Sequence, residues 1–165
     1  MDEWKIIRER RTGYGRRRRI RGSRDIYESF KEHFARLDRE HFVVLLLDAK
    51  NTMLGFHTVS IGSLTSSVVH PREAYKLLVL YNEVVNRSEQ EVIAAVCAHG
   101  IRASAAAMIL LHNHPSGDPT PSQEDQHITK RLRDVGDILG IRVIDHLVFG
   151  YERYVSFVDD GYWPT

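Results

Sequence analysis

Short runs of consecutive apolar residues mark the places where the chain is expected to cross the interior of a sheet. The runs at 41–47 and 107–111 are apolar on both faces and too short for typical helices, which predicts two buried central strands. Residues 53–61 alternate in part and follow the first run after a turn, so they are expected to form a hairpin with it. Further strands are predicted at 142–149 and 154–158.

Between these runs, apolar residues recur at the spacing of amphipathic helices. This spacing predicts helices over 25–37 and 122–139. A third helix is expected over 70–85, because the proline near its start suits the first position of a helix. A capping-box pattern at Ser88–Glu91 indicates a fourth helix, around 86–106.

The composition is that of one ordinary soluble domain with a tail. Of the 165 residues, 42% are hydrophobic and 27% are charged, and no apolar run approaches the length needed to span a membrane. The N-terminus has no apolar segment of the kind found in secretory signal peptides. The single cysteine, Cys97, cannot form an internal disulfide, so a reducing cytoplasm is the expected location. One cysteine also excludes the Cys-x-x-Cys half of a zinc deaminase site.

The charge is divided unevenly along the chain. Residues 1–24 carry ten basic residues against three acidic ones, a net charge of +7 that leaves −6 on the remainder. Such a composition cannot bury enough apolar area to fold, which predicts a disordered basic arm over 1–24. The arm could neutralise nucleic-acid phosphates with release of counterions. It could also be a solvated tail, or the remnant of a lost upstream domain.

Two histidines follow the second apolar run and precede a proline-rich loop. His112 and His114 alternate along the expected strand, so their side chains point the same way. Asp125 lies at the edge of the inward stripe of the next helix, where a carboxylate is costly unless it is paired or coordinates a metal. Two imidazoles and one carboxylate make a three-ligand zinc set with a fourth position free for water. The alternative is ordinary strand-end histidines, with Ser122 and Asp125 forming only a capping box.

The spacing of these residues resembles a known signature. His-x-His, then seven residues, Ser122, two residues and Asp125, resembles the motif of JAMM (MPN-type) zinc metalloproteases. The stretch from His112 to Ser122 resembles more narrowly the bacterial RadC-type branch of that superfamily. The resemblance covers about residues 25–160.

This resemblance implies a fold and a metal. It implies an α/β fold for residues 25–165, with the cytidine-deaminase-like mixed β-sheet of JAMM/MPN domains flanked by helices. It also implies that His112, His114 and Asp125 hold Zn²⁺, with water as the fourth ligand. The expected activity is metal-assisted hydrolysis of an amide bond in a peptide or protein substrate.

The resemblance further implies the residues that would handle protons and charge. In the JAMM pattern an upstream glutamate hydrogen-bonds the water at the metal, and the sequence of residues 37–42 resembles the corresponding RadC phrase, which indicates Glu40. Without the resemblance, Glu40 would be taken for a solvated acid at the head of a strand. Its rivals for this role are Glu28, Glu32 and Glu73. Ser122 is expected to hydrogen-bond the developing oxyanion.

The chain also departs from the RadC pattern. His70 and His112 are 42 residues apart, whereas RadC-like chains pass between the corresponding positions in one short helix. The excess suggests a helical insertion around 86–106, which could reshape a substrate groove or form an oligomer contact. Asp145-His146 also resembles a RadC phrase, and we expect a hydrogen-bonded pair that orients neighbouring groups.

Two other functions stay open. One is a nucleic-acid-associated protein, linked to DNA repair by the RadC label, whose basic arm is the working part and whose metal site is structural or vestigial. The other is an interaction scaffold, because some MPN relatives lack the metal residues. The presence of Glu40, His112, His114 and Asp125 argues against the scaffold.

Overall fold

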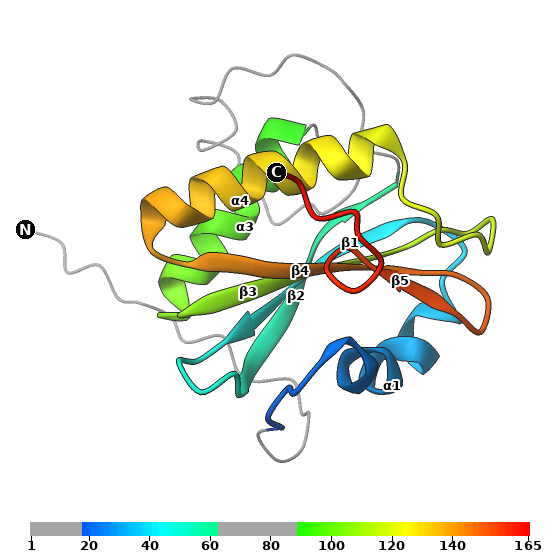
Figure 1. The fold of residues 1–165 in the computed structure, drawn as a ribbon, viewed down its shortest axis with the longest axis horizontal. Coiled ribbons are helices and arrows are strands. Elements are labelled where there is room, and N and C mark those ends of the chain that lie inside the picture. Colours follow the sequence, from blue (N-terminus) through cyan, green and yellow to red (C-terminus); the bar gives the residue numbers. More distant parts are fainter. Residues whose placement is uncertain (1–17, 63–88) are drawn as a thin grey trace, which may run out of the picture.

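The computed structural model describes residues 18–62 and 89–165, which form a five-stranded sheet with helices on both faces (Figure 1). The strands lie in the order β2-β1-β3-β4-β5. Their bounds are β1 His41–Leu47, β2 Met53–Ile61, β3 Ala107–Asn113, β4 Arg142–Phe149 and β5 Tyr154–Ser156. The helices are α1 Ser23–Phe34, α3 Glu89–Arg102 and α4 Gln123–Leu139.

The sheet is mixed. β1 pairs antiparallel with both β2 and β3, β3 pairs with β4 in parallel, and β4 pairs antiparallel with β5. The parallel pair is joined through α4, the kind of crossover that parallel neighbours require. The α/β fold with a mixed sheet flanked by helices is therefore confirmed.

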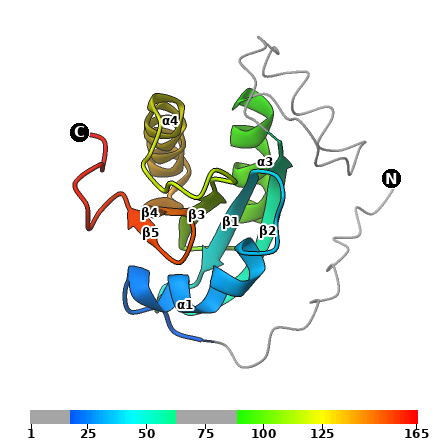
Figure 2. The ribbon, with the colours of Figure 1, turned by 90° about the vertical axis from the view of Figure 1, so that its right-hand side faces the viewer.

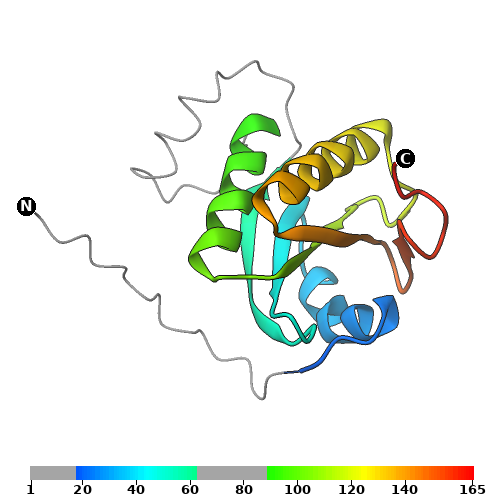
Figure 3. The ribbon, with the colours of Figure 1, turned by 60° about the vertical axis from the view of Figure 1, so that its left-hand side comes forward.

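The two faces of the sheet carry separate apolar cores, because alternate residues of a strand point to opposite sides. One face is covered by α3 and α4 and the other by α1 (Figures 2 and 3). Val44 of β1 belongs to the core that includes Val96 of α3 and Leu132 of α4. Leu45 belongs to the core that includes Phe30 of α1. A strand buried on both faces needs no polar positions, which explains the continuous apolar run of β1.

Most elements begin and end close to their predicted positions. β1, β2 and β4 coincide with predicted strands, and β3 continues beyond its apolar run to include His112 and Asn113. α1 begins two residues early, at Ser23, and ends at Phe34. α4 ends where Gly140 takes a left-handed conformation (φ 71°), a helix stop that glycine favours.

The predicted arm over 1–24 is too long, because its last residues belong to the folded body. Ile20 is buried in the core under α1, and its amide donates to the carbonyl oxygen of Asn51 at 2.8 Å. Residues 23 and 24 already form the first turn of α1. The expectation of disorder is therefore wrong for 18–24, and residues 1–17 lie outside the described part of the chain.

Two helices were expected between β2 and β3. α3 lies within the region 86–106 that was predicted to be a helical insertion, and its status as an insertion stays a prediction. The helix expected over 70–85 falls outside the described residues. Across residues 18–62 and 89–165, no helix combines the length and the apolar character needed to cross a membrane.

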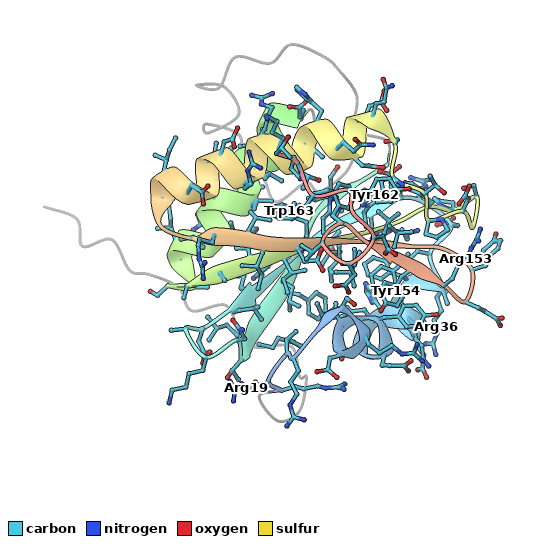
Figure 4. The ribbon with its side chains drawn as sticks, in the orientation of Figure 1. Arg19, Arg36, Arg153, Tyr154, Tyr162 and Trp163 are labelled. Carbon is cyan, nitrogen blue, oxygen red and sulfur yellow. The ribbon has the colours of Figure 1, made fainter. Side chains whose placement is uncertain are left out.

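The C-terminal segment folds back over the sheet beside α4. Trp163 packs against the core beneath α3 and α4, and the ring of Tyr162 lies 6.0 Å from that of Phe157 (Figure 4). Phe157 in turn stacks on His146 of β4, with 4.7 Å between the ring centroids. Phe157 and the residues that follow it therefore cover one side of the buried His146 ring.

Candidate metal centre

β3 and α4 bring together the three residues that the sequence predicted as metal ligands. His112 Nε2 lies 3.2 Å from Asp125 Oδ1, and His114 Nε2 lies 3.3 Å from Asp125 Oδ2. The two Nε2 atoms are 2.9 Å apart. Each residue offers one ligand atom, an imidazole nitrogen or a carboxylate oxygen, and these three atoms all lie within 4.8 Å of one another. The three residues could therefore hold a metal ion.

The sheet and the helix N-terminus position these side chains. His112 is fully buried in β3, between Phe42 of β1 and Val148 of β4. Asp125 lies in the first turn of α4, where its Oδ2 accepts from the Ser122 amide at 2.7 Å and its own amide donates to Ser122 Oγ at 3.1 Å. The predicted capping box is therefore present. It does not compete with the metal-ligand role, because it fixes the Asp125 carboxylate beside both histidines.

The loop between β3 and α4 is held by the turn between β4 and β5. Gly117 has a φ of 85°, and a Cβ at this position would lie 2.2 Å from the Tyr151 ring, so only glycine fits. The Tyr151 amide donates to the Gly117 carbonyl at 3.0 Å, and its hydroxyl donates to the Pro115 carbonyl at 3.1 Å. In the same loop, the Asp118 carbonyl lies 2.7 Å from His114 Nδ1. The turn thus orients His114 through the loop.

The hydrogen bond of His114 decides which of its ring nitrogens carries the hydrogen. A carbonyl oxygen only accepts, so His114 Nδ1 must donate to Asp118. In the neutral ring, Nε2 then carries a lone pair that points at His112 and Asp125. Electron-rich atoms converge at this point, and a proton or a cation among them relieves their repulsion. This donor set fits a divalent metal ion that accepts nitrogen and carboxylate ligands.

The pKa values at the centre shift in the direction expected for such a site. Burial acts to raise the pKa of Asp125, but the imidazoles of His112 and His114 hold it well below its usual range. The pKa of His114 is raised, first by its hydrogen bond with Asp125, and burial opposes this shift. The carboxylate is therefore ionised, and the Nε2 positions attract positive charge.

Glu40 lies next to this group. It is half-buried at the start of β1, and its carbonyl accepts from the Gly62 amide at 2.8 Å. Burial raises the pKa of its carboxyl, and Asp125 adds to that rise while His112 and His114 oppose it. The Glu40 carboxyl therefore lies within electrostatic range of all three candidate ligands.

The rival glutamates are placed differently. Glu28 lies on α1 and forms ion pairs with Lys31 at 2.6 Å and with Arg24 at 3.2 Å. Glu32 is an exposed residue of the same helix. Glu73 lies outside the described residues. Among the described candidates, Glu40 is the one that interacts with the ligand group.

Ser122 stands at the N-cap of α4 and is exposed. Its Oγ accepts from the Asp125 amide, so the hydroxyl keeps its own hydrogen for donation. Its predicted hydrogen bond to an oxyanion stays a prediction.

Asp145 and His146 of β4 form the predicted hydrogen-bonded pair, through the backbone amide of His146 and not through its ring. The carboxylate of Asp145 accepts from the backbone amides of His146 (2.7 Å) and Val158 (3.2 Å), and from the Ser156 hydroxyl (2.8 Å). Burial raises the pKa of Asp145 to about 6. The ring of His146 contacts the metal centre instead, with Nε2 2.8 Å from His112 Nδ1. Burial lowers the pKa of His146 well below its usual value.

Two buried polar residues at the centre were not singled out from the sequence. Asn113, between the two histidines, hydrogen-bonds to the backbone on either side of Glu40. Thr129, one turn after Asp125, contacts the ring of His146. Thr129 lies four residues after Asp125, on the same face of the predicted helix, and this spacing is the signal that could have indicated it. Asn113 lies beyond the apolar run 107–111 and had no such signal.

Known proteins match most of this chain. The family model described as the RadC-like JAB domain matches residues 20–95 and 85–162. A UPF0758 protein of Desulforamulus reducens is 46% identical over 142 residues, which cover 86% of this chain and 53% of the relative. A UPF0758 protein of Geotalea uraniireducens is 42% identical over 153 residues, 90% of this chain and 58% of the relative. A UPF0758 protein of Bacillus cereus is 41% identical over 152 residues, 92% and 58% respectively.

The chain spans little more than half the length of the curated relatives that it matches. The two matched segments nevertheless include every helix and strand of the described fold, and they include Glu40, His112, His114 and Asp125. The chain therefore belongs to the family of RadC-like JAB domains.

Proposed function

We propose that this chain is a zinc-dependent hydrolase that cleaves an amide bond in a peptide or protein substrate, as a peptidase or isopeptidase. The observation that supports the proposal is the convergence of His112, His114 and Asp125, with Glu40 close enough to interact with all three. Two imidazoles and a carboxylate are a ligand set of catalytic zinc sites. The one cysteine, Cys97, is buried and free, which fits a reducing cytoplasm as the place of this activity.

In this proposal His112, His114 and Asp125 hold the ion. When bound, zinc would polarise the scissile carbonyl and lower the pKa of an attacking water to about 7. Glu40 accepts a proton from the attacking water and returns it to the leaving amine. Burial raises the pKa of Glu40 towards neutral pH. A carboxyl with such a pKa can both take up and release a proton during the reaction. Ser122 donates its hydroxyl hydrogen to the developing oxyanion.

A peptidase screen tests the proposal. Zinc-loaded protein is assayed against linear peptides and against substrates joined through a lysine side chain. Cleavage that a chelator abolishes, that zinc restores and that Asp125→Ala lacks is the expected result. Zinc-replete protein that cleaves no amide bond in either substrate class would contradict the hydrolase assignment.

A second candidate function is association with nucleic acid, for which the charge division of the sequence is the supporting observation. If about four to six phosphates are neutralised, the logarithm of the affinity for duplex DNA should fall with log salt at a slope of roughly −4 to −5. Little sequence preference is expected, because phosphate contacts do not read bases.

Anisotropy with labelled duplex DNA at several salt concentrations measures this slope. The comparison is with a full-length variant whose arginines before residue 18 are replaced by glutamine: Arg8, Arg10, Arg11, Arg16 and Arg17. Weaker binding with a shallower slope and unchanged zinc content is expected. Equal binding by the two proteins would remove the proposed role of these arginines.

A further inference from the structure

A chain of short contacts runs behind the metal centre, on the side away from the ligand atoms of His112. His112 Nδ1 lies 2.8 Å from His146 Nε2, and His146 Nδ1 lies 2.6 Å from Thr129 Oγ1. The Thr129 hydroxyl donates to the backbone carbonyl of Asp125 at 2.5 Å. The side chains of His112, His146 and Thr129 are fully buried. This series of contacts therefore starts at the candidate ligand His112 and ends on the backbone of the candidate ligand Asp125.

The last contact decides the direction of all the others. The Asp125 carbonyl can only accept, so the one hydrogen of the Thr129 hydroxyl is committed to it. Thr129 Oγ1 must then accept from His146, which places the ring hydrogen of His146 on Nδ1. The bare Nε2 of His146 accepts from Nδ1 of His112. His112 is thereby left with a lone pair on Nε2, the atom that faces His114 and Asp125.

Two aromatic side chains pack against the His146 ring and oppose its rotation. Phe157 stacks on the ring at 4.7 Å between centroids, and Phe42 meets it nearly edge-on at 5.6 Å. A histidine that binds metal commonly donates its other ring N–H to an acceptor that fixes the tautomer. Here that acceptor is a second histidine, whose own tautomer depends on Thr129.

We propose that Thr129 and His146 are positioning residues for the metal, because together they keep Nε2 of His112 free of hydrogen. This inference rests on the metal centre of the proposed function and not on any hydrolytic activity. Without the Thr129 hydroxyl, the Nδ1 hydrogen of His146 would be buried with no acceptor, which is a costly state for a donor. The ring would then favour the other tautomer, with its hydrogen on Nε2. His112 would have to accept at Nδ1 and carry its hydrogen on Nε2, where it blocks the metal.

Thr129→Val tests the inference, because valine matches threonine in shape but lacks the hydroxyl. Its zinc affinity, measured by competition with a chromophoric chelator, should be about 10- to 100-fold weaker than that of the wild-type protein. Thr129→Ser keeps the hydroxyl and should bind zinc as the wild type does. Circular dichroism of all three proteins checks that they are folded.

A second measurement needs no variant. Nitrogen-15 NMR of the histidine rings in the zinc-loaded wild-type protein should show His146 with its hydrogen on Nδ1, the less common tautomer of neutral histidine. A hydrogen on Nε2 of His146 would overturn the inference, as would zinc binding by Thr129→Val within twofold of the wild type. A wild-type protein that binds no zinc would overturn the metal centre itself, and the two failures are therefore distinguishable.

Discussion

Asn113 binds the backbone on both sides of Glu40. Its Nδ2 donates to the carbonyl of Arg39 and its Oδ1 accepts from the amide of His41, each at 2.9 Å. Asn113 is buried and lies between His112 and His114 on β3. The strand that presents the two histidines therefore also holds the backbone on both sides of Glu40, and one side chain links the candidate ligands to the candidate base.

Asn113→Ala should uncouple Glu40 from the ligands. The variant loses both hydrogen bonds and leaves the part-buried amide of His41 without its partner, so the free energy of unfolding should fall by roughly 1–3 kcal/mol. Zinc content should stay unchanged, because both histidines remain, while hydrolysis should fall. Denaturant titration and elemental analysis measure the two effects. Asn113→Asp keeps the acceptor for His41 but turns a carboxylate oxygen towards the Arg39 carbonyl, so it should be no more stable than Asn113→Ala.

The protein should contain about one zinc ion per chain, and removal of one ligand should empty the site. His112→Ala and Asp125→Ala each leave two of the three protein ligands, so both should lower the zinc content to near zero by elemental analysis. His127→Ala is the control, because His127 is an exposed histidine of α4 whose ring faces Glu89 at 3.7 Å. Full zinc occupancy in both ligand variants would show that the ion binds elsewhere.

Zinc affinity should fall as the pH is lowered through the range in which His114 takes up a proton. Protons and zinc compete for the same Nε2 atom, and the hydrogen bond with Asp125 raises the pKa of His114 above its ordinary value. The competition should therefore begin at a higher pH than for a free imidazole, whose pKa is about 6.5. Affinity should drop by about tenfold per pH unit for each proton displaced. A zinc affinity that stays constant between about pH 5 and 8 would argue against histidine ligands.

Glu40→Gln should separate zinc binding from hydrolysis. Glutamine has nearly the same size but cannot accept a proton from water, so amide hydrolysis should fall by roughly two orders of magnitude or more with zinc retained. Initial rates on a substrate found in the screen measure the effect. Glu32→Gln, a change on the exposed surface of α1, should leave the rate unchanged. Normal cleavage by Glu40→Gln would assign the base to another glutamate, and Glu73 would be tested next.

Asp145→Asn should change how stability depends on pH. Burial raises the pKa of Asp145 from 3.8 to about 6, so the folded state binds this proton more tightly than the unfolded chain. The stability that the group contributes is fully present below pH 3.8 and is lost as the pH rises to about 6. Asparagine keeps an oxygen for the His146 and Val158 amides but does not titrate.

The free energy of unfolding of Asp145→Asn, relative to the wild type, should therefore increase by roughly 1–3 kcal/mol between about pH 4 and 6. Denaturant titrations at several pH values measure this difference. Asp134→Asn, at a half-exposed position of α4, should give no such increase. A constant difference between Asp145→Asn and the wild type across this range would mean that Asp145 titrates normally.

Local features of the sequence were sufficient to predict most elements and the ligand group. β1 and β3 could be recognised because each is buried on both faces, and this leaves a continuous apolar run. His112, His114 and Asp125 could be recognised because alternation along a strand and the first turn of a helix fix their directions over 14 residues of chain. The helix stop at Gly140 is equally local, since it depends on the backbone freedom of one residue.

The tertiary structure decided which of these elements are neighbours. Periodicity records whether a face is buried but not what buries it, so the position of β1 between β2 and β3 could not be derived from the pattern. The packing of Ile20 against the body likewise overrode a local composition that indicated disorder. Asn113 meets the backbone around Glu40 across more than 70 residues, and His146 reaches His112 across 34, because parallel and antiparallel pairing bring β1 and β4 to the two sides of β3. The sequence by itself determined the candidate ligands and the strand that carries two of them. The groups that hold and orient these residues depend on strand order, which long-range packing sets.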